Sequence, residues 1–450
     1  MEVDPANHDT GLASTRRSLR ERTAWLQSQL PTIYVGVLGG LQIVLLWMYR
    51  VRFGSIIPLA GGVLLLCLVV LLRRPGERWH WRMLLLLALI TVTTFAPSVV
   101  AIDQREHAGL TFESDSMAMD EVAVDRILHG HPIYATDWSG TQVDGYGYEY
   151  GGIDLHYYAH FPLMVQAAVP LRVVSDLLHV PFDYRMVVLV FSLVALCAIY
   201  RLPIAPRDRF MLAVATLLNP AISLAGWTGH DDMCYLAVLL VGLVLAGRRH
   251  FLWSALAFGA AAALKPFAIL TLPFVLVALY KGSPASASRR ARFRTCLEAC
   301  GLFAVPLLLS IGPFLVHDAA GFYRDTVNFP TAVLPLGGFG FSGLLVALRI
   351  VPIGAQFPLG PLELGAAIPA LWFTLRAFAK RPTMGHFLMG YCIVLFAFLF
   401  FARFFADNYL AILIGLALCV PSLTSVRVLP LAHEAPPGLA RDLSQGTSAA

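Results

Sequence analysis

Long apolar runs occupy most of the chain between Pro31 and Val420 and restrict what it can fold into. Crossing the hydrocarbon core of a bilayer takes about 20 apolar residues per helix. Backbone in lipid must satisfy its own hydrogen bonds, so only helices and closed barrels span membranes. Only 14% of the 450 residues are charged, against roughly 25% in soluble domains. The sequence therefore excludes a soluble globule and predicts an all-α, polytopic transmembrane protein.

About twelve of these runs are predicted to be membrane helices, a count that is open by one or two. They are expected at residues 31–48, 56–72, 83–101, 186–200, 210–227, 235–246, 252–263, 267–280, 296–316, 359–375, 387–401 and 409–420. The run 337–350 is apolar but short and rich in glycine, and it is interpreted as a re-entrant or interfacial segment.

Basic residues gather beside particular runs and indicate an orientation in the membrane. Cytoplasmic loops carry an excess of Lys and Arg. This places the Arg-rich amino terminus inside, together with the basic clusters at 73–78, 201–209, 248–249, 281–294 and 376–381. Only Arg50 and Arg52 fall on the wrong side. Because the formal charge of +5 is concentrated in these clusters, nucleic acid is not expected as a partner.

The predicted helices divide the chain into five parts, expected to form a multi-pass protein of the plasma membrane. The parts are a basic cytoplasmic terminus (1–30), three helices (31–101), an extracytoplasmic loop (102–184), the remaining bundle (185–425) and a tail (426–450). Both termini lack apolar periodicity and are predicted to be disordered. The large loop is expected to carry short amphipathic helices and the chemistry.

The large loop is too long for a simple connection, which indicates a function. Residues 102–183 hold thirteen Asp and Glu against three Arg. Tyrosines gather at Tyr146, Tyr148, Tyr150, Tyr157 and Tyr158. Acidic groups and amphipathic aromatic rings suit sugar binding at a membrane surface. The alternative is a solvated acidic loop.

Asp115 opens a segment with helical periodicity. Met119, Val122 and Arg126 fall on one helical face with Asp115, which predicts a short helix over 116–129 lying along the membrane. Asp115 then stands at the amino end of this helix. The alternative role is a simple N-cap, because an Asp carboxylate accepts hydrogen bonds from the first backbone amides.

Further polar motifs stand beside predicted outer helix ends. His156, Tyr158 and His160 precede an amphipathic stretch over 163–178, and these histidines either bind phosphate or form hydrogen bonds in the interface. His230 to Asp232 end the fifth predicted helix with the same ambiguity. Lys265 ends the seventh, and a lysine so close to lipid is costly unless it is paired or functional.

In order, these motifs resemble the GT-C superfamily of integral-membrane glycosyltransferases, particularly bacterial polyprenyl-phosphate-mannose-dependent mannosyltransferases. The resemblance spans most of the chain, and although each motif is weak singly, their order is more specific. The motifs are Asp115 to Asp120, Leu128 to Tyr134, Tyr158 to Pro162, Asn219-Pro220, Gly229 to Asp232 and Leu264 to Pro266.

The resemblance implies a reaction and a role for each motif. Asp115, with Asp120 as the fallback, would be the general base that takes a proton from the acceptor hydroxyl. A sugar, mannose first, would pass from a polyprenyl-phosphate donor to an envelope glycolipid or polysaccharide, inverting the anomeric carbon. The residues expected to bind the donor phosphate or substrate are Lys265, His156, His160, His230, Asp232, Arg324, His317, Arg403 and Tyr158. No cofactor and no obligatory metal is expected, although Asp231-Asp232 leaves a metal open.

Two features of the sequence depart from the family pattern. Relatives often meet the catalytic loop directly after their first helix, whereas two further helices precede it here. Many also carry an aromatic residue just after the Asp, whereas Ser116 follows Asp115 here.

Two other functions fit part of the sequence. A transporter or lipid flippase explains twelve helices but not the long acidic loop, and it would require a water-filled path lined by Arg403, Lys265 and Asp407. A non-catalytic scaffold would use Asp115 only as a cap and the loop as a docking surface.

Overall fold

The computed structural model describes residues 25, 28–74, 76, 78–109, 111–143, 157–283 and 286–428. Among them, the only strands are β1 (Gly337–Gly338) and β2 (Phe404–Phe405), which form one short parallel pair. Most of the other described residues are helical, which confirms the prediction of an all-α protein. The disorder predicted for both termini falls mainly on residues outside the described part.

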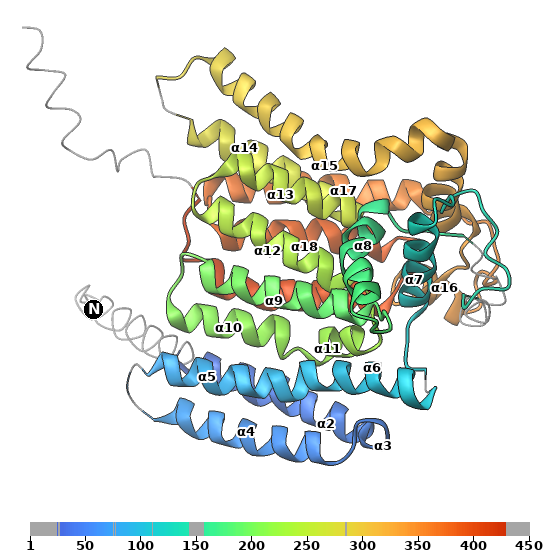
Figure 1. The fold of residues 1–450 in the computed structure, drawn as a ribbon. Coiled ribbons are helices and arrows are strands. Elements are labelled where there is room, and N and C mark those ends of the chain that lie inside the picture. The colour runs from blue at the N-terminus through green and yellow to red at the C-terminus, as the bar shows by residue number, and fades with distance from the viewer. Residues whose placement is uncertain are drawn as a thin grey trace, which may run out of the picture.

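The first helices form a layer along one side of a larger bundle, and α5 packs against α10 (Figure 1). A buried hydrogen bond from Gln42 Nε2 to the Thr93 carbonyl, 2.7 Å long, joins two helices of this layer. The layer consists of η1 (Val35–Gly39), α2 (Gly40–Met48), α3 (Arg50–Phe53), α4 (Ile56–Arg73), α5 (Trp79–Ile90), η2 (Thr91–Phe95) and α6 (Ala96–Ala108).

The bundle contains most of the buried apolar residues. Its first part is α9 (Arg185–Arg201), α10 (Pro206–Leu217), α11 (Pro220–Trp227), α12 (Asp232–Gly247), α13 (Phe251–Leu264), η4 (Pro266–Thr271) and α14 (Leu272–Gly282). The chain bends by 49° between α10 and α11. Asn219 Oδ1 accepts from the Ala221 amide, and Pro220 fits the first turn of the new helix.

The second part of the bundle is α15 (Arg289–Tyr323), η5 (Arg324–Val333), α17 (Gly360–Lys380), α18 (Met384–Phe400) and α19 (Asp407–Leu423). The segment predicted as re-entrant lies before α17 and folds as β1 and a short helix, α16 (Phe341–Ala347). Gly338 joins the two with φ of 80°. A Cβ there would lie 2.2 Å from the Phe405 carbonyl oxygen, so only glycine fits.

Each of the twelve predicted runs contains a helix, but fewer qualify as membrane spans by length and composition. Five described helical stretches qualify, and a sixth does if the bent pair α10 and α11 is one span. The five are Ser28–Met48, Ile56–Arg73, Trp79–Ala108, Arg289–Val333 and Gly360–Lys380. The shorter apolar helices α12, α13, α14, α18 and α19 fall below the length limit, so the count of twelve stays a prediction.

The large loop contributes two helices that cross one end of the bundle. These are α7 (Asp115–Leu128) and α8 (Pro162–Leu177), which run crosswise to α9, α12 and α13 (Figure 1). The N-cap of α7 is Ser114, whose hydroxyl accepts from the Met117 amide at 3.2 Å. The suggestion that Asp115 is the N-cap is therefore wrong. Residues 116–121 are all buried, deeper than expected for a helix on a membrane surface.

Candidate functional site

Helix α7 is held at the end of the bundle by an arginine that approaches from α6. Arg105 donates two hydrogen bonds to the Glu121 carboxylate, at 2.8 and 2.7 Å. Glu121 also accepts from the Tyr184 amide at the start of α9. A bidentate Arg–carboxylate pair fixes orientation as well as distance. Because Asp120 directly precedes Glu121 in α7, these contacts also fix the position of Asp120.

Asp120, His160 and Asp231 meet in a buried group that joins three parts of the chain. His160 Nδ1 lies 3.1 Å from Asp120 Oδ1 and 3.7 Å from Asp231 Oδ2. Both carboxylates are 0% exposed. The Tyr158 hydroxyl donates to Asp120 Oδ1 at 2.8 Å, and its ring stacks on Trp138. The predicted fallback base and one predicted histidine are thus in contact, far from each other in sequence.

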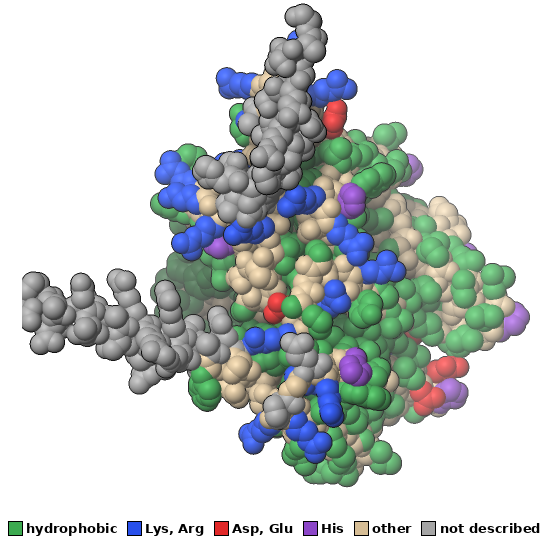
Figure 2. Space-filling model, turned by 90° about the vertical axis from the view of Figure 1, so that its left-hand side faces the viewer, with side chains coloured by type: hydrophobic (Ala, Val, Ile, Leu, Met, Phe, Trp, Pro, Cys, Tyr) green, Lys and Arg blue, Asp and Glu red, His purple; other side chains and the backbone are tan. Residues whose placement is uncertain are grey.

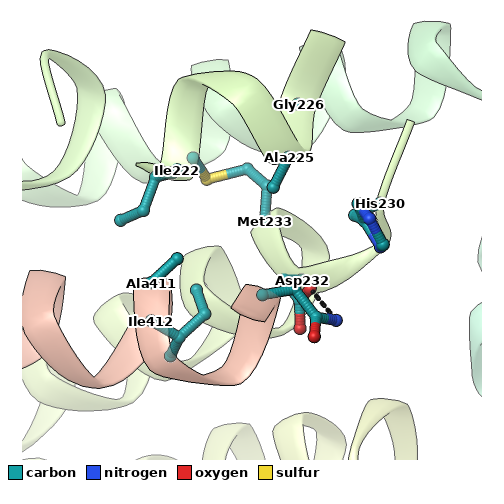
Figure 3. A pocket seen from close by; sticks show the side chains of 9 residues that line it. Ile222, Ala225, Gly226, His230, Asp232, Met233, Ala411 and Ile412 are labelled. Carbon is teal, nitrogen blue, oxygen red and sulfur yellow. Dashed lines mark hydrogen bonds between the residues drawn. The ribbon is translucent and has the colours of Figure 1, made fainter. Parts of the chain in front are cut away.

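Lys265 extends this group across the bundle. Its Nζ lies 2.8 Å from Asp231 Oδ1 and 2.6 Å from Asp232 Oδ1. Asp232 Oδ2 accepts from Asn408 Nδ2 at 2.7 Å, the dashed contact in Figure 3. The lysine that the sequence marks as costly near lipid is therefore paired with two carboxylates. We call Asp120, His160, Asp231, Lys265 and Asp232 the buried cluster.

Burial and neighbouring charges in the buried cluster shift the pKa values of His160 and Asp120. Burial disfavours a charged imidazole, but the facing carboxylates of Asp231 and Asp120 outweigh burial and raise the pKa of His160 to about 9. Burial raises the pKa of Asp120, although His160 opposes this shift. The carboxylates of the buried cluster therefore stabilise positive charge at His160.

A cavity of about 750 Å³ opens beside the buried cluster. Its polar wall includes Asp115, His160, His230, Asp407 and Asn408. The remainder is largely apolar or aromatic and includes Tyr49, Met119, Leu224, Phe339, Phe404, Tyr409, Leu410 and Ile414. Apolar walls with a few convergent polar groups are typical of small-molecule and lipid sites. A much smaller neighbouring pocket lies between α11, α12 and α19, lined by Ile222, Met233 and Ile412 (Figure 3).

The two candidate bases occupy different environments. Asp115 is half-buried at the first turn of α7 and lines the cavity. Its Oδ1 accepts from the Ser116 amide at 2.7 Å, and the Ser116 hydroxyl lies 3.3 Å from His230 Nδ1. Asp120 is fully buried and does not line the cavity. A base must come within hydrogen-bond reach of its substrate, so the geometry favours Asp115.

Three predicted phosphate-binding residues, Arg324, His317 and Arg403, belong neither to the cavity wall nor to the buried cluster. Arg324 pairs with Asp325 and lies over the Tyr157 ring. His317 is exposed on α15. Arg403 is buried and donates to the backbone carbonyls of Leu334 and Ala355. These three residues were predicted from their outward position alone. In the structure Arg324 and Arg403 contact other groups, and His317 lies on the exposed surface.

Some predicted residues fall outside the described part, and some lining residues were missed. His156 lies outside the described residues, as do Tyr146, Tyr148 and Tyr150. Asn408 was not predicted, although Asp407 and Asn408 directly precede the last apolar run. Lys265 was predicted because it is a polar residue at the outer end of an apolar run. Asn408 stands in the same kind of position and could have been predicted on the same ground.

One group of described residues could hold a metal ion. The ligand atoms of Asp120, His160 and Asp231 all lie within 4.8 Å of one another. The sequence left a metal open at Asp231-Asp232, but Asp232 is occupied by Lys265 and Asn408. The structure thus brings Asp231 together with Asp120 and His160 instead.

Apolar helices long enough to span a membrane, with a polar site at one end of the bundle, define the class: a membrane protein built from helices. Within it, residues 157–281 match the family described as alpha-(1->6)-mannopyranosyltransferase, N-terminal domain. The match confirms the resemblance to mannosyltransferases. Comparison with curated proteins and with solved structures gave no match.

The matched segment covers most of the buried cluster. It includes His160, Asp231, Asp232 and Lys265, whereas Asp115 lies before it. The similarity therefore supports a glycosyltransferase acting on mannose, and it leaves the role of Asp115 to be tested separately.

Proposed function

We propose that this chain transfers mannose from a polyprenyl-phosphate donor to a glycolipid or polysaccharide acceptor of the cell envelope. The family match supports mannose as the sugar. The observation that carries the proposal is the 750 Å³ cavity, which combines an apolar wall with the carboxylate of Asp115. A lipid-linked donor needs both an apolar surface for its chain and a polar pocket for its sugar.

Asp115 is proposed as the general base. Its carboxylate accepts the proton of the acceptor hydroxyl as that oxygen attacks the anomeric carbon. The bond to the donor phosphate breaks at the same time, and the electron pair leaves with the polyprenyl phosphate. A single displacement from the opposite face inverts the anomeric carbon. General-base catalysis typically contributes about 10² to 10⁴ fold in rate.

His160 and His230 are proposed as donors to the leaving phosphate. Both line the cavity, whereas Arg324, His317 and Arg403 do not. Lys265 is held by Asp231 and Asp232. Preorganised donors stabilise charge that develops on a leaving oxygen. This route needs no metal ion or other cofactor at the reacting atoms, and we propose none as obligatory for transfer.

The active site is proposed to face the outside of the plasma membrane, with the amino terminus in the cytoplasm. Figure 2 shows Lys and Arg side chains gathered on the end of the bundle opposite α7 and α8. Helix α9 ends there with Arg201, and Arg248 follows the end of α12. Basic helix ends favour the cytoplasmic side. About twelve crossings, counting the shorter apolar helices, fit this arrangement.

The transporter alternative receives less support. Of the three residues expected to line a transport path, only Asp407 lines the cavity. Lys265 is enclosed by carboxylates, and Arg403 donates to backbone carbonyls. A cavity beside one end of the bundle suits a transferase, which needs access to lipid and to one aqueous side.

The test is mannose transfer from radiolabelled polyprenyl-phosphate-mannose by membranes that contain the protein. Cell-envelope glycolipids serve as acceptors, and polyprenyl-phosphate-glucose serves as a control for the sugar. Transfer of mannose well above that of glucose supports the proposal. Absence of transfer from both donors, at matched protein level, overturns the lipid-linked donor.

A further inference from the structure

Two carboxylate oxygens of the buried cluster lack hydrogen-bond partners within the described residues. They are Asp120 Oδ2 and Asp231 Oδ2, and both side chains are 0% exposed. An unsatisfied buried polar atom costs about 1–3 kcal/mol, more when charged. Native proteins rarely keep such atoms without a ligand, an ion or a water molecule. The two oxygens therefore indicate something bound between them.

The arrangement of ligand atoms indicates what binds. His160 Nδ1 and one oxygen each from Asp120 and Asp231 lie within 4.8 Å of one another. We propose that Asp120, His160 and Asp231 bind one divalent transition-metal ion of the Zn²⁺ or Mn²⁺ class. One imidazole and two carboxylates are ligands that these ions accept, whereas Mg²⁺ prefers oxygen alone. Small side-chain rotations would bring the ligand atoms to bonding distance.

Charge balance in the buried cluster supports a cation. Three carboxylates, those of Asp120, Asp231 and Asp232, are buried there. Lys265 supplies one permanent positive charge against them. Charges removed from water must be compensated locally. The imidazolium form of His160 offsets only one of the two remaining negative charges. A divalent ion that displaces this proton and binds the neutral imidazole would offset both.

Neighbouring groups orient the ligands as they do in known metal sites. The Tyr158 hydroxyl donates to Asp120 Oδ1, and Lys265 Nζ contacts Asp231 Oδ1. Such outer contacts leave the second oxygen of each carboxylate for the ion. His160 lines the cavity, which supplies an entry path and an open coordination position.

The ion would act through His160. Metal binding at Nδ1 places the ring proton on Nε2 and makes this N–H a stronger donor. In this step the inference rests on the proposed function, because the donor would face the leaving phosphate. The ion itself binds no reacting atom in this account, and Asp115 remains the base.

Metal content of the purified full chain tests the site directly. The protein in detergent is treated with a chelator and reloaded with Zn²⁺ alone or Mn²⁺ alone, and bound metal is measured by mass spectrometry. Wild type should hold about one ion per chain, and loss of a ligand should weaken binding at least tenfold. The variants are Asp120→Asn and His160→Gln. Asp125→Asn is the matched control, because Asp125 lies on α7 but pairs with Arg172.

The outcomes separate this site from the proposed function. Equal metal content in wild type and both ligand variants, or no bound metal in wild type, would overturn the site. If Asp120→Asn does not fold, His160→Gln and the absorption spectrum of Co²⁺-loaded wild type decide, since tetrahedral nitrogen and oxygen ligation gives strong visible bands. Asp115→Asn should bind metal normally. Loss of transfer in that variant with metal retained supports both proposals independently.

Discussion

The buried cluster and the cavity wall are neighbours built from the same residue types, yet they differ in solvent access and in partners. Carboxylates of the buried cluster are enclosed and contact Lys265, His160 or Tyr158. Asp115 and His230 on the wall are partly exposed to a 750 Å³ cavity. We infer that the enclosed carboxylates hold the site together, whereas the residues of the cavity wall, His160 among them, contact the substrate.

This comparison predicts the largest stability loss at Lys265. Lys265→Met leaves Asp231 and Asp232 buried without their cation, which should cost about 3–5 kcal/mol of unfolding free energy. Lys281→Met is the matched control, because Lys281 is exposed and donates to the Ala379 carbonyl. Thermal unfolding in detergent measures both. Equal melting temperatures would show that the ion pairs of Lys265 with Asp231 and Asp232 do not stabilise the fold.

Tyr158 should give a smaller loss. Tyr158→Phe removes the hydroxyl that donates to Asp120 at 2.8 Å. A hydrogen bond to a charged group contributes about 1.5–3 kcal/mol, so we expect a melting temperature between those of wild type and Lys265→Met. Tyr157→Phe, next to it in sequence and outside the buried cluster, should be close to wild type. A lower melting temperature for Tyr157→Phe than for Tyr158→Phe would show that the Tyr157 hydroxyl, and not that of Tyr158, stabilises the fold.

On the cavity wall, His230 should show the opposite pattern. His230→Ala removes a proposed donor to the leaving phosphate, and we expect transfer to fall roughly tenfold or more. Its unfolding free energy should change by no more than about 0.5 kcal/mol, as for other surface changes. His129→Ala, an exposed histidine at the end of α7, is the control for both readouts. A loss of stability without a change in the transfer rate would show that His230 has a structural role and does not act on the leaving phosphate.

The smallest effect is expected at His317. It is exposed on α15 and does not line the cavity. His317→Ala should keep transfer within about twofold and stability within about 0.5 kcal/mol of wild type. Initial rates at several donor concentrations provide the measurement. A tenfold rise in the KM for the donor would show that His317 contributes to donor binding.

Much of the fold was predictable because apolar runs and their polar breaks are local signals. Helices formed in every predicted run, and α7 (Asp115–Leu128) lies one residue from the predicted range 116–129. The assembly of Asp120 with His160 and Asp231 was not predictable, because the three are brought together only by tertiary packing.

The cationic residues show the same limit. Arg324, His317 and Arg403 were expected at the donor phosphate from their outward position. The local sequence places Asp325 directly after Arg324, but nothing local reveals that Arg403 donates to two carbonyls far from it in sequence. Lys265 could be recognised as paired or functional, since an unpaired lysine there would be costly. Its two partners required the structure.

The most direct measurement of the central claim is transfer from radiolabelled polyprenyl-phosphate-mannose by Asp115→Asn beside Asp120→Asn, at matched levels of folded protein. Each change keeps the shape of the side chain and removes its basicity. We expect a loss of about 10² fold or more for Asp115→Asn. Asp120→Asn should retain a larger share of the rate, with lowered stability. Normal transfer by Asp115→Asn, with Asp120→Asn inactive but folded, would contradict the assignment of the base to the cavity wall.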